Sequence, residues 1–286
     1  MIEVCHVTKR FQSTTRGVTA AVHDMSIAIG DGELVCLVGP SGCGKTTLLN
    51  LIAGLERPDE GEVLVGGKRV RAPGPDRGVM FQDPALFPWL SVAENVAFGM
   101  KELRVPRKER IARTKRYLEL VKMSGFARAW VHELSGGMKQ RVALARALAL
   151  EPDILLMDEP FGALDPKSRD ALQAELVDIW QKTGKTIVFV THDMAEAVRL
   201  GSRVIVLRAR PARVALDVDV AARLPQPRHV DQSEVVELAA QLKSGLDETG
   251  EHEAVDGDGH GSEHRQAQVA GGSGAGSVAG WLGLHL

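Results

Sequence analysis

The chain has 286 residues, of which 44% are hydrophobic, 25% charged and 4% aromatic. This composition is ordinary for a globular protein and excludes collagen-like, disulfide-scaffold and wholly disordered chains. The formal net charge of −2 provides no overall attraction to nucleic acid or to an anionic membrane surface.

In chain order, the first predicted elements are strands with partly alternating hydrophobicity, followed by a short apolar run that predicts a strand buried on both faces. Similar apolar runs recur twice, and the segments between them have helical periodicity. Strands of this kind separated by helices predict a parallel α/β sheet. The predicted strands cover residues 2–7, 20–27, 34–38, 153–157 and 186–190, and the predicted helices cover residues 107–122 and 168–182.

The strand at residues 34–38 leads directly into a segment that fits the P-loop pattern GxxxxGK[ST]. The glycines let the backbone wrap tightly, so that successive N–H groups and the following helix N-terminus face a phosphate. We expect Lys45 to reach the β- and γ-phosphates and Thr46 to ligate Mg²⁺. Cys43 is expected as a small residue of which only the backbone N–H is needed; the alternative is a thiol whose pKa the helix dipole lowers. The predicted nucleotide contacts are Gly39, Pro40, Ser41, Gly42, Cys43, Gly44, Lys45, Thr46 and Thr47.

Two carboxylates, Asp158 and Glu159, follow the strand at residues 153–157. Parallel sheets bind ligands at the carboxyl ends of their strands. Adjacent strand residues point to opposite faces, but the turn at residues 160–162 can redirect Glu159. We expect Asp158 to hold the Mg²⁺ shell and Glu159 to orient and polarise the attacking water. Taken alone, the pair also fits a helix cap or the start of a solvated loop.

A second predicted anion cradle lies at the segment LSGGM, residues 134–138. Ser135 is the predicted N-cap of a helix that continues to Leu150, and Gly136 and Gly137 leave backbone amides bare at its start. The alternative interpretation is a capped helix without a ligand.

This ordered set of motifs resembles the ATP-binding cassette (ABC) family. Within residues 1 to about 245 the motifs follow one another in the family's order: the P-loop, LSGGM, ILLMDEP, Ala163-Leu164-Asp165 and Thr191-His192-Asp193. The resemblance implies a P-loop NTPase fold: an α/β core with a RecA-like parallel sheet, an antiparallel β subdomain and an inserted α-helical subdomain at about residues 84–150. It also implies that two cassettes pair head to tail, so that each MgATP lies between one P-loop and the partner's LSGG segment.

The resemblance assigns further roles to single residues. Ser135, Gly136 and Gly137 would bind the γ-phosphate across the interface, and Asp165 would couple the two sites. Phe11 falls where the family has an aromatic ring on adenine, here without a tyrosine hydroxyl. A lone histidine after a strand is also compatible with a purely structural role. The implied catalytic residues are Glu159, His192 and Lys45, and the implied metal ligands are Thr46, Gln82 and Asp158.

The type of cassette machine is narrowed by what the sequence lacks. Only 90 residues separate Lys45 from Ser135, too few for a long coiled coil beside a helical subdomain, which excludes the cassette ATPases of chromosome-organising machines. The sequence has one cassette, whereas the ribosome-associated type needs two. Three scattered cysteines cannot supply the zinc module of the excision-repair type. Transport remains as the expected role. A soluble cassette ATPase coupled to a non-transport machine is the alternative.

The segment from Leu86 to Val96 resembles the ATPase subunits of nitrate, taurine and aliphatic sulfonate importers. We expect Trp89 to anchor a permease subunit, although packing inside the helical subdomain is the alternative. The basic run from Arg104 to Arg116 lacks interleaved aromatic residues, so we expect no nucleic acid partner. The implied partners are a second, identical cassette, transmembrane permease subunits and a periplasmic or lipid-anchored solute-binding protein.

The location follows from the same observations. Three cysteines are too few for a disulfide framework and indicate a reducing compartment. The first residues, MIEVCHVTKRF, lack the features of a signal peptide, and no stretch offers about 20 consecutive apolar residues. We therefore expect a peripheral protein on the cytoplasmic face of the inner membrane.

The composition changes near residue 246. Residues 247–286 contain seven acids and one base, and glycine is frequent. Such a segment cannot bury enough apolar surface to offset its ordering entropy. We expect an ABC ATP-binding domain at residues 1–245 and a Gly-rich, acidic, disordered tail at residues 246–286. The tail's histidines would at most bind a metal weakly.

Overall fold

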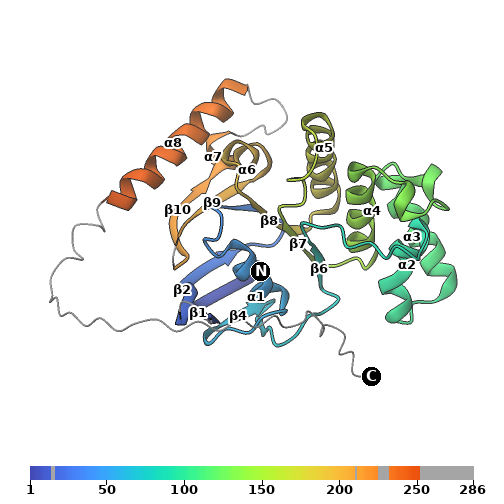
Figure 1. The fold of residues 1–286 in the computed structure, drawn as a ribbon, viewed down its shortest axis with the longest axis horizontal. Helices are drawn as coiled ribbons and strands as arrows, with labels where there is room; N and C mark the ends of the chain where they lie inside the picture. Colours follow the sequence, from blue (N-terminus) through green and yellow to red (C-terminus); the bar gives the residue numbers. More distant parts are fainter. Residues whose placement is uncertain (14–16, 210, 225–231, 252–286) are drawn as a thin grey trace, which may run out of the picture.

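Two sheets and a separate group of helices make up the fold in the computed structural model of the chain (Figure 1). The structure describes residues 1–13, 17–209, 211–224 and 232–251. The tail expected from residue 246 overlaps helix α8 (Gln232–Glu251) in its first six residues, and its remainder lies outside the described residues.

The larger sheet has six strands in the order β10-β9-β3-β8-β7-β6. Neighbouring strands from β9 to β6 are parallel, and β10 pairs antiparallel with β9. Every residue of β3 and β8 is buried, because both faces of the sheet are covered. The predicted parallel α/β sheet is confirmed. Its strands are β3 (Leu34–Val38), β6 (Arg77–Met80), β7 (Ile154–Asp158), β8 (Thr186–Thr191), β9 (Arg203–Arg208) and β10 (Arg213–Asp219).

The smaller sheet is antiparallel, in the order β2-β1-β4-β5, and confirms the expected antiparallel β subdomain. Its apolar face and one face of the larger sheet form a single hydrophobic core around helix α1 (Lys45–Ala53). That core fixes α1, and therefore the P-loop before it, between the two sheets. The strands are β1 (Ile2–Ser13), β2 (Gly17–Ile29), β4 (Glu60–Val65) and β5 (Lys68–Arg69).

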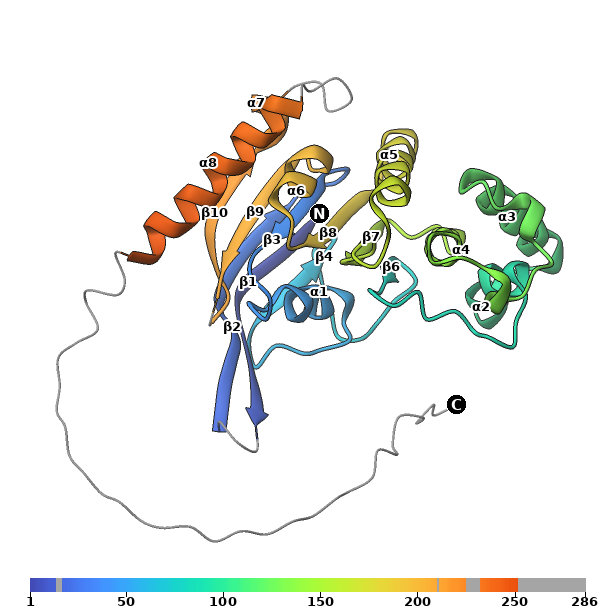
Figure 2. The same cartoon turned by 45° about the horizontal axis from the view of Figure 1, so that its top comes forward.

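Three helices form a group on the far side of β6 and β7 from the small sheet, as Figures 1 and 2 show. They are α2 (Val92–Glu102), α3 (Arg107–Leu120) and α4 (Gly136–Ala149), with short 3₁₀ turns at Ser124–Phe126 and Val131–Glu133. Helix α4 packs against α2, α3 and α5 (Pro166–Thr183), so it connects this group to the core. The inserted helical subdomain implied by the motifs is therefore present.

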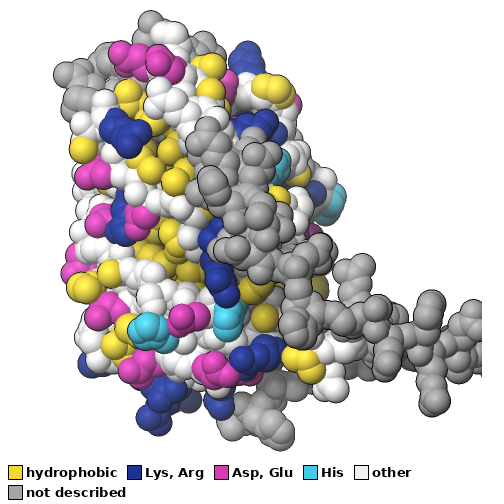
Figure 3. Space-filling view, turned by 90° about the vertical axis from the view of Figure 1, so that its left-hand side faces the viewer, with side chains coloured by type: hydrophobic (Ala, Val, Ile, Leu, Met, Phe, Trp, Pro, Cys, Tyr) yellow, Lys and Arg dark blue, Asp and Glu magenta, His cyan; other side chains and the backbone are white. Residues whose placement is uncertain are grey.

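The remaining helices cover the other end of the larger sheet. Helix α6 (Met194–Leu200) follows β8, α7 (Val220–Arg223) follows β10, and α8 packs against α6, β9 and β10. Four apolar side chains of α8 are buried there: Val235, Leu238, Ala239 and Leu242. On the side of the molecule that carries α8, hydrophobic side chains are interspersed with acidic and basic ones (Figure 3).

Of the helices in the described ranges, none combines the length and the apolar character that a bilayer crossing requires.

Candidate active site

The P-loop joins the end of β3 to the start of α1, and close backbone packing explains two of its glycines. A Cβ on Gly39 would lie 2.4 Å from the carbonyl oxygen of Leu207. Gly44 has φ 104°, and a Cβ there would lie 2.5 Å from the carbonyl oxygen of Ala21. Side chains are therefore excluded at both positions, and the loop presents backbone to whatever lies within it.

Lys45, the first residue of α1, is 5% exposed and turns back over the loop. Its Nζ donates to the carbonyl oxygens of Gly39 at 2.8 Å and Pro40 at 3.0 Å. A buried ammonium held only by neutral carbonyls is a strong attractant for an anion. This geometry suits a phosphate group beside Lys45.

The structure contradicts the alternative interpretation of Cys43, a thiol with a lowered pKa. Its side chain is buried, and burial raises the pKa of the thiol, although the Lys45 charge and a backbone hydrogen bond act in the opposite direction. The helix dipole is outweighed because the thiolate would be desolvated between the loop and the core.

Thr46 and Asp158 meet across the end of the sheet. The Thr46 hydroxyl donates to Asp158 Oδ1 at 3.1 Å. Burial raises the pKa of Asp158, and the hydrogen bond from Thr46 opposes that rise. A hydroxyl and a desolvated carboxylate side by side supply the hard oxygen ligands that Mg²⁺ prefers, so these residues fit the expected metal.

Glu159 lies directly after β7 and has φ 41°, a left-handed backbone conformation that is unusual for glutamate. Its N–H donates to the carbonyl oxygen of Val190 on the neighbouring strand β8. This turn of the backbone carries its carboxylate to the His192 ring, where Nδ1 lies 3.0 Å from Oε2. The carboxylate is half-buried and the imidazole is exposed. The structure thus places the predicted carboxylate and histidine, 33 residues apart, in one hydrogen bond.

The N-termini of helices α4 and α5 lie close to each other. Ser135 caps α4 by accepting from the Met138 N–H, and Asp165 caps α5 by accepting from the Ser168 N–H. The hydrogen bonds from Ser168 lower the pKa of Asp165. The Cβ position on Gly137 is 3.7 Å from Ser168, so the LSGG segment of a chain lies beside the start of its own α5. Its predicted phosphate partner is the P-loop of another chain.

Gln82 and Phe11 are the outlying members of the predicted site. Gln82 follows β6 and is exposed, and its carbonyl oxygen accepts from Gln140 of α4 at 3.2 Å. Phe11 on β1 is 41% exposed, with the Lys9 ammonium 5.2 Å from its ring centre. Phe11 therefore presents an open aromatic face, as adenine stacking requires.

Trp89 is 69% exposed, which overturns the alternative that it packs inside the helical subdomain. Its ring contacts Phe87, which in turn contacts Phe98 of α2. The sequence interpretation missed the residue that fixes this segment, Asn95, whose buried amide bonds to the backbone of residues 87–91. The available signal was an asparagine four residues after Ser91, a residue type whose side chain often bonds to nearby backbone.

A hollow of about 820 Å³ adjoins the first half of the P-loop. It is lined by residues 38–41, by the start of α6 from His192 to Ala195, and by Ala239, Ala240 and Lys243 of α8. The side of the P-loop that faces His192 is therefore open at the surface of a single chain.

The chain is similar to ABC transporter ATP-binding proteins in sequence and in fold. A family model described as ABC transporter matches residues 22–162. An uncharacterised ABC transporter ATP-binding protein of Methanocaldococcus jannaschii is 48% identical over 227 residues, 79% of this chain and 85% of that protein. The taurine import ATP-binding protein TauB of Burkholderia pseudomallei is 50% identical over 202 residues, 71% of this chain and 78% of that protein. The dimeric structure of an ATP-binding cassette in a post-hydrolysis state, bound to ADP and phosphate, matches with a TM-score of 0.68 at 33% identity, covering 77% of this chain and 99% of the other.

Proposed function

The chain belongs to the ABC transporter family of ATP-binding proteins, and from that premise we propose that it is the ATPase subunit of a bacterial importer of the nitrate, taurine or aliphatic sulfonate type. The observation that supports its chemistry is the meeting of the P-loop, Asp158 and the Glu159–His192 pair at one edge of the sheet. Its similarity to a taurine import ATP-binding protein supports the direction of transport and the class of solute.

We assign phosphate binding to the P-loop, residues 39–47. Lys45 would exchange its two carbonyl partners for the β- and γ-phosphate oxygens, gaining charge-assisted hydrogen bonds. Thr46, Asp158 and Gln82 would hold Mg²⁺, which when bound supplies positive charge to the phosphates. Phe11 would stack on the adenine ring through its exposed face.

Glu159 is assigned as the residue that orients the attacking water and accepts its proton. The hydrogen bond to His192 Nδ1 orients the carboxylate, and the other ring nitrogen of His192, Nε2, would contact the γ-phosphate. Half-burial keeps bulk water away from one side of the carboxylate. The left-handed backbone at Glu159 is the local strain that this placement requires.

The site would be completed by a second copy of the chain. Ser135, Gly136 and Gly137 lie at a helix N-terminus with bare amides, which is an anion-binding arrangement. They adjoin the start of α5 rather than a phosphate cradle of their own chain. In a head-to-tail pair they would bind the partner's γ-phosphate, and Asp165 beside them would couple the two sites.

Permease subunits would dock on the helical subdomain at Trp89. The Phe87, Trp89 and Phe98 rings form a continuous aromatic group whose outer member is exposed, and Gln82 lies just before this segment. An exposed tryptophan backed by packed aromatics is a suitable anchor for a partner's short helix. A peripheral position on the cytoplasmic face of the inner membrane would follow, with a solute-binding protein on the other side.

Affinity purification of the full chain from its own membranes tests this proposal. We expect a multi-span membrane protein to copurify, and we expect the Trp89→Ala chain to recover much less of it than the Arg104→Ala chain, an exposed control on the same subdomain. Recovery of soluble partners alone would favour a cassette ATPase of a non-transport machine instead.

A further inference from the structure

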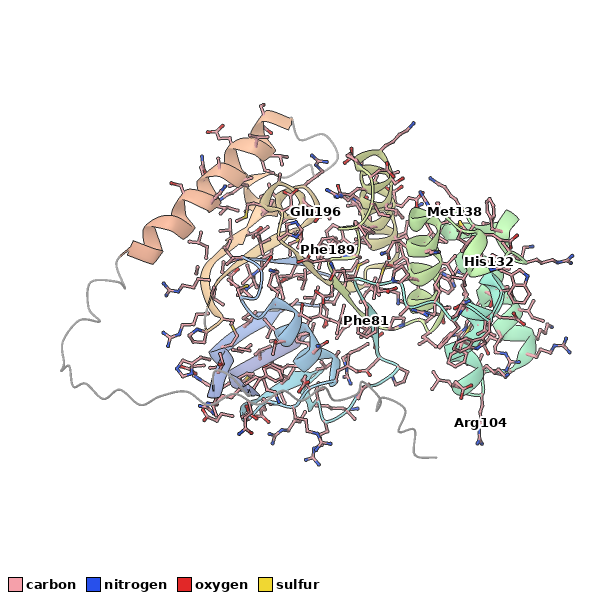
Figure 4. The ribbon with its side chains drawn as sticks, in the orientation of Figure 1. Phe81, Arg104, His132, Met138, Phe189 and Glu196 are labelled. Carbon is pink, nitrogen blue, oxygen red and sulfur yellow. The ribbon has the colours of Figure 1, made fainter. Side chains whose placement is uncertain are left out.

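We propose that Glu196 is a positioning residue for ATP hydrolysis: it holds the turn that carries His192 against helix α5, and thereby sets the place of the His192 ring relative to the Glu159 carboxylate. This inference rests on the proposed roles of Glu159 and His192. Glu196 lies in the first turn of α6, just after the loop that carries His192, and Figure 4 shows it between α6 and α5.

Both carboxylate oxygens of Glu196 are engaged by residues from other elements. The Thr191 hydroxyl, at the last position of β8, donates to Oε2. The Gln173 amide of α5 donates to Oε1 at 2.7 Å. Thr191 and Gln173 are themselves 2% and 4% exposed. The Glu196 carboxylate therefore links Thr191, the residue directly before His192, to Gln173 of α5, the helix that follows the Glu159 loop.

The His192 turn depends on the same hydroxyl. Thr191 Oγ1 also accepts from the Asp193 N–H at 3.0 Å, so one side chain fixes both flanks of His192. Asp193 in turn caps α6 by accepting from the N–H groups of Ala195 and Glu196. Since Asp193 already satisfies the start of α6, the Glu196 carboxylate is not needed as a cap. It points inward instead.

A second side chain of α5 holds the loop that follows Glu159. The Arg169 guanidinium donates to the carbonyl oxygens of Phe161, Gly162 and Leu164 at 3.1–3.3 Å. Its positive charge also favours the ionised form of Glu196. Burial raises the pKa of Glu196, and the hydrogen bonds from Thr191 and Gln173 oppose that rise. Helix α5 thus carries, one turn apart, the residue that holds the Glu159 loop and the residue that holds Glu196.

Helix α5 therefore holds both the loop that follows Glu159 and, through Glu196, the turn that carries His192. The ring of Phe161, in the loop after Glu159, packs on the ring of Phe189 of β8, with the ring centres 5.7 Å apart. If the α6 contact with α5 is removed, the His192 turn loses its fixed relation to the Glu159 loop, while the P-loop and its contacts stay unchanged. A loss of geometry of this kind lowers the rate of the chemical step more than it lowers nucleotide affinity.

The test is steady-state ATPase kinetics of the full chain with Glu196→Ala, Glu196→Gln and Thr191→Val. For Glu196→Ala we expect kcat to fall ~10- to 100-fold, as misplacement of catalytic groups by about 1 Å does, with KM for MgATP close to the wild-type value. Glu196→Gln should recover most of the rate, because an amide still accepts from Thr191 and pairs with Gln173 once that amide turns over. Thr191→Val keeps the side-chain shape, removes the hydroxyl and should lower kcat even if Glu196→Ala fails to fold.

The matched control is Asp170→Ala. It breaks the exposed ion pair between Arg199 of α6 and Asp170 of α5, which joins the same two helices without touching either loop, and kcat should be unchanged. An undiminished kcat in both Glu196→Ala and Thr191→Val would overturn the inference, as would equal loss in Asp170→Ala or no recovery in Glu196→Gln. If Glu159→Gln loses its rate while Glu196→Ala keeps it, the proposed active site stands and only this inference fails.

Discussion

Replacing Asn95 with alanine should destabilise the segment that presents Trp89. The Asn95 side chain is fully buried one turn into α2. Its Nδ2 lies 3.0–3.2 Å from the carbonyl oxygens of Phe87, Leu90 and Ser91, and its Oδ1 accepts from the Phe87 N–H at 2.8 Å. Backbone N–H groups also reach two of these oxygens, from Leu90 to Phe87 and from Asn95 to Ser91, so the loss falls most heavily on the Leu90 carbonyl and the Phe87 N–H.

The magnitude follows from this geometry. An amide has two N–H hydrogens, so the three carbonyl oxygens share two donors, and with the accepted bond about three hydrogen bonds are lost. At about 1 kcal/mol net for each bond, the free energy of unfolding should fall by about 3 kcal/mol. For a domain of this size that corresponds to a fall of about 6–12 °C in Tm.

Thermal unfolding of the full chain, followed by circular dichroism, provides the measurement. Trp89→Ala is the matched control, since it alters the same segment at an exposed position and should leave Tm within about 2 °C of wild type. Asn95→Asp puts a buried carboxylate against the same three carbonyl oxygens, and should lower Tm at neutral pH at least as far as Asn95→Ala does. A Tm for Asn95→Ala equal to that of Trp89→Ala would show that the segment is held by other contacts.

Three further predictions concern single positions. Lys45→Ala should abolish tight MgATP binding, measured by equilibrium titration with a fluorescent ATP analogue, because it removes the buried cation of the cradle; normal affinity would refute the P-loop assignment. Trp89→Ala should leave the affinity for that analogue unchanged while membrane assembly weakens, and lost nucleotide binding with intact assembly would contradict its role as an anchor. Cys43 should react with a maleimide more slowly than the half-buried Cys5, because burial both covers its thiol and raises its pKa; faster labelling of Cys43, identified by peptide mass, would show that the loop opens in the empty protein.

Local pattern is sufficient for the parts of the fold and site that depend on neighbours in sequence. The buried apolar runs predict β3, β7 and β8, and the P-loop pattern places Lys45 and Thr46 at the start of a helix. The turn after Asp158 is expected to redirect Glu159, and the left-handed backbone at Glu159 does so. These features follow from hydrophobic period and turn chemistry within about ten residues.

Other features depend on which strands become neighbours, and no local pattern contains that information. The Glu159–His192 contact exists because β7 and β8 are adjacent in the sheet. Glu196 looks in sequence like an ordinary acid in the first turn of a helix, and only the packing of α6 on α5 gives it Gln173 as a partner. Helix α8 depends on distant partners in the same way, since its buried apolar residues Val235, Leu238, Ala239 and Leu242 pack where α8 meets α6, β9 and β10.

The central claim is that hydrolysis occurs in a composite site made by two copies of the chain. Glu159→Gln keeps the size of the side chain but cannot accept a proton, so turnover should fall roughly 10²- to 10⁴-fold while MgATP still binds. Sedimentation velocity of this variant with MgATP should then show a dimer, stabilised by the two unhydrolysed nucleotides. Adding Ser135→Arg should return the protein to a monomer, because a bulky side chain would occupy the γ-phosphate-binding position that the partner's LSGG segment supplies. The assay is made both on the chain alone and on its assembly with permease subunits. A Glu159→Gln chain that turns over at the wild-type rate, or whose dimer persists with Ser135→Arg, would contradict the composite site.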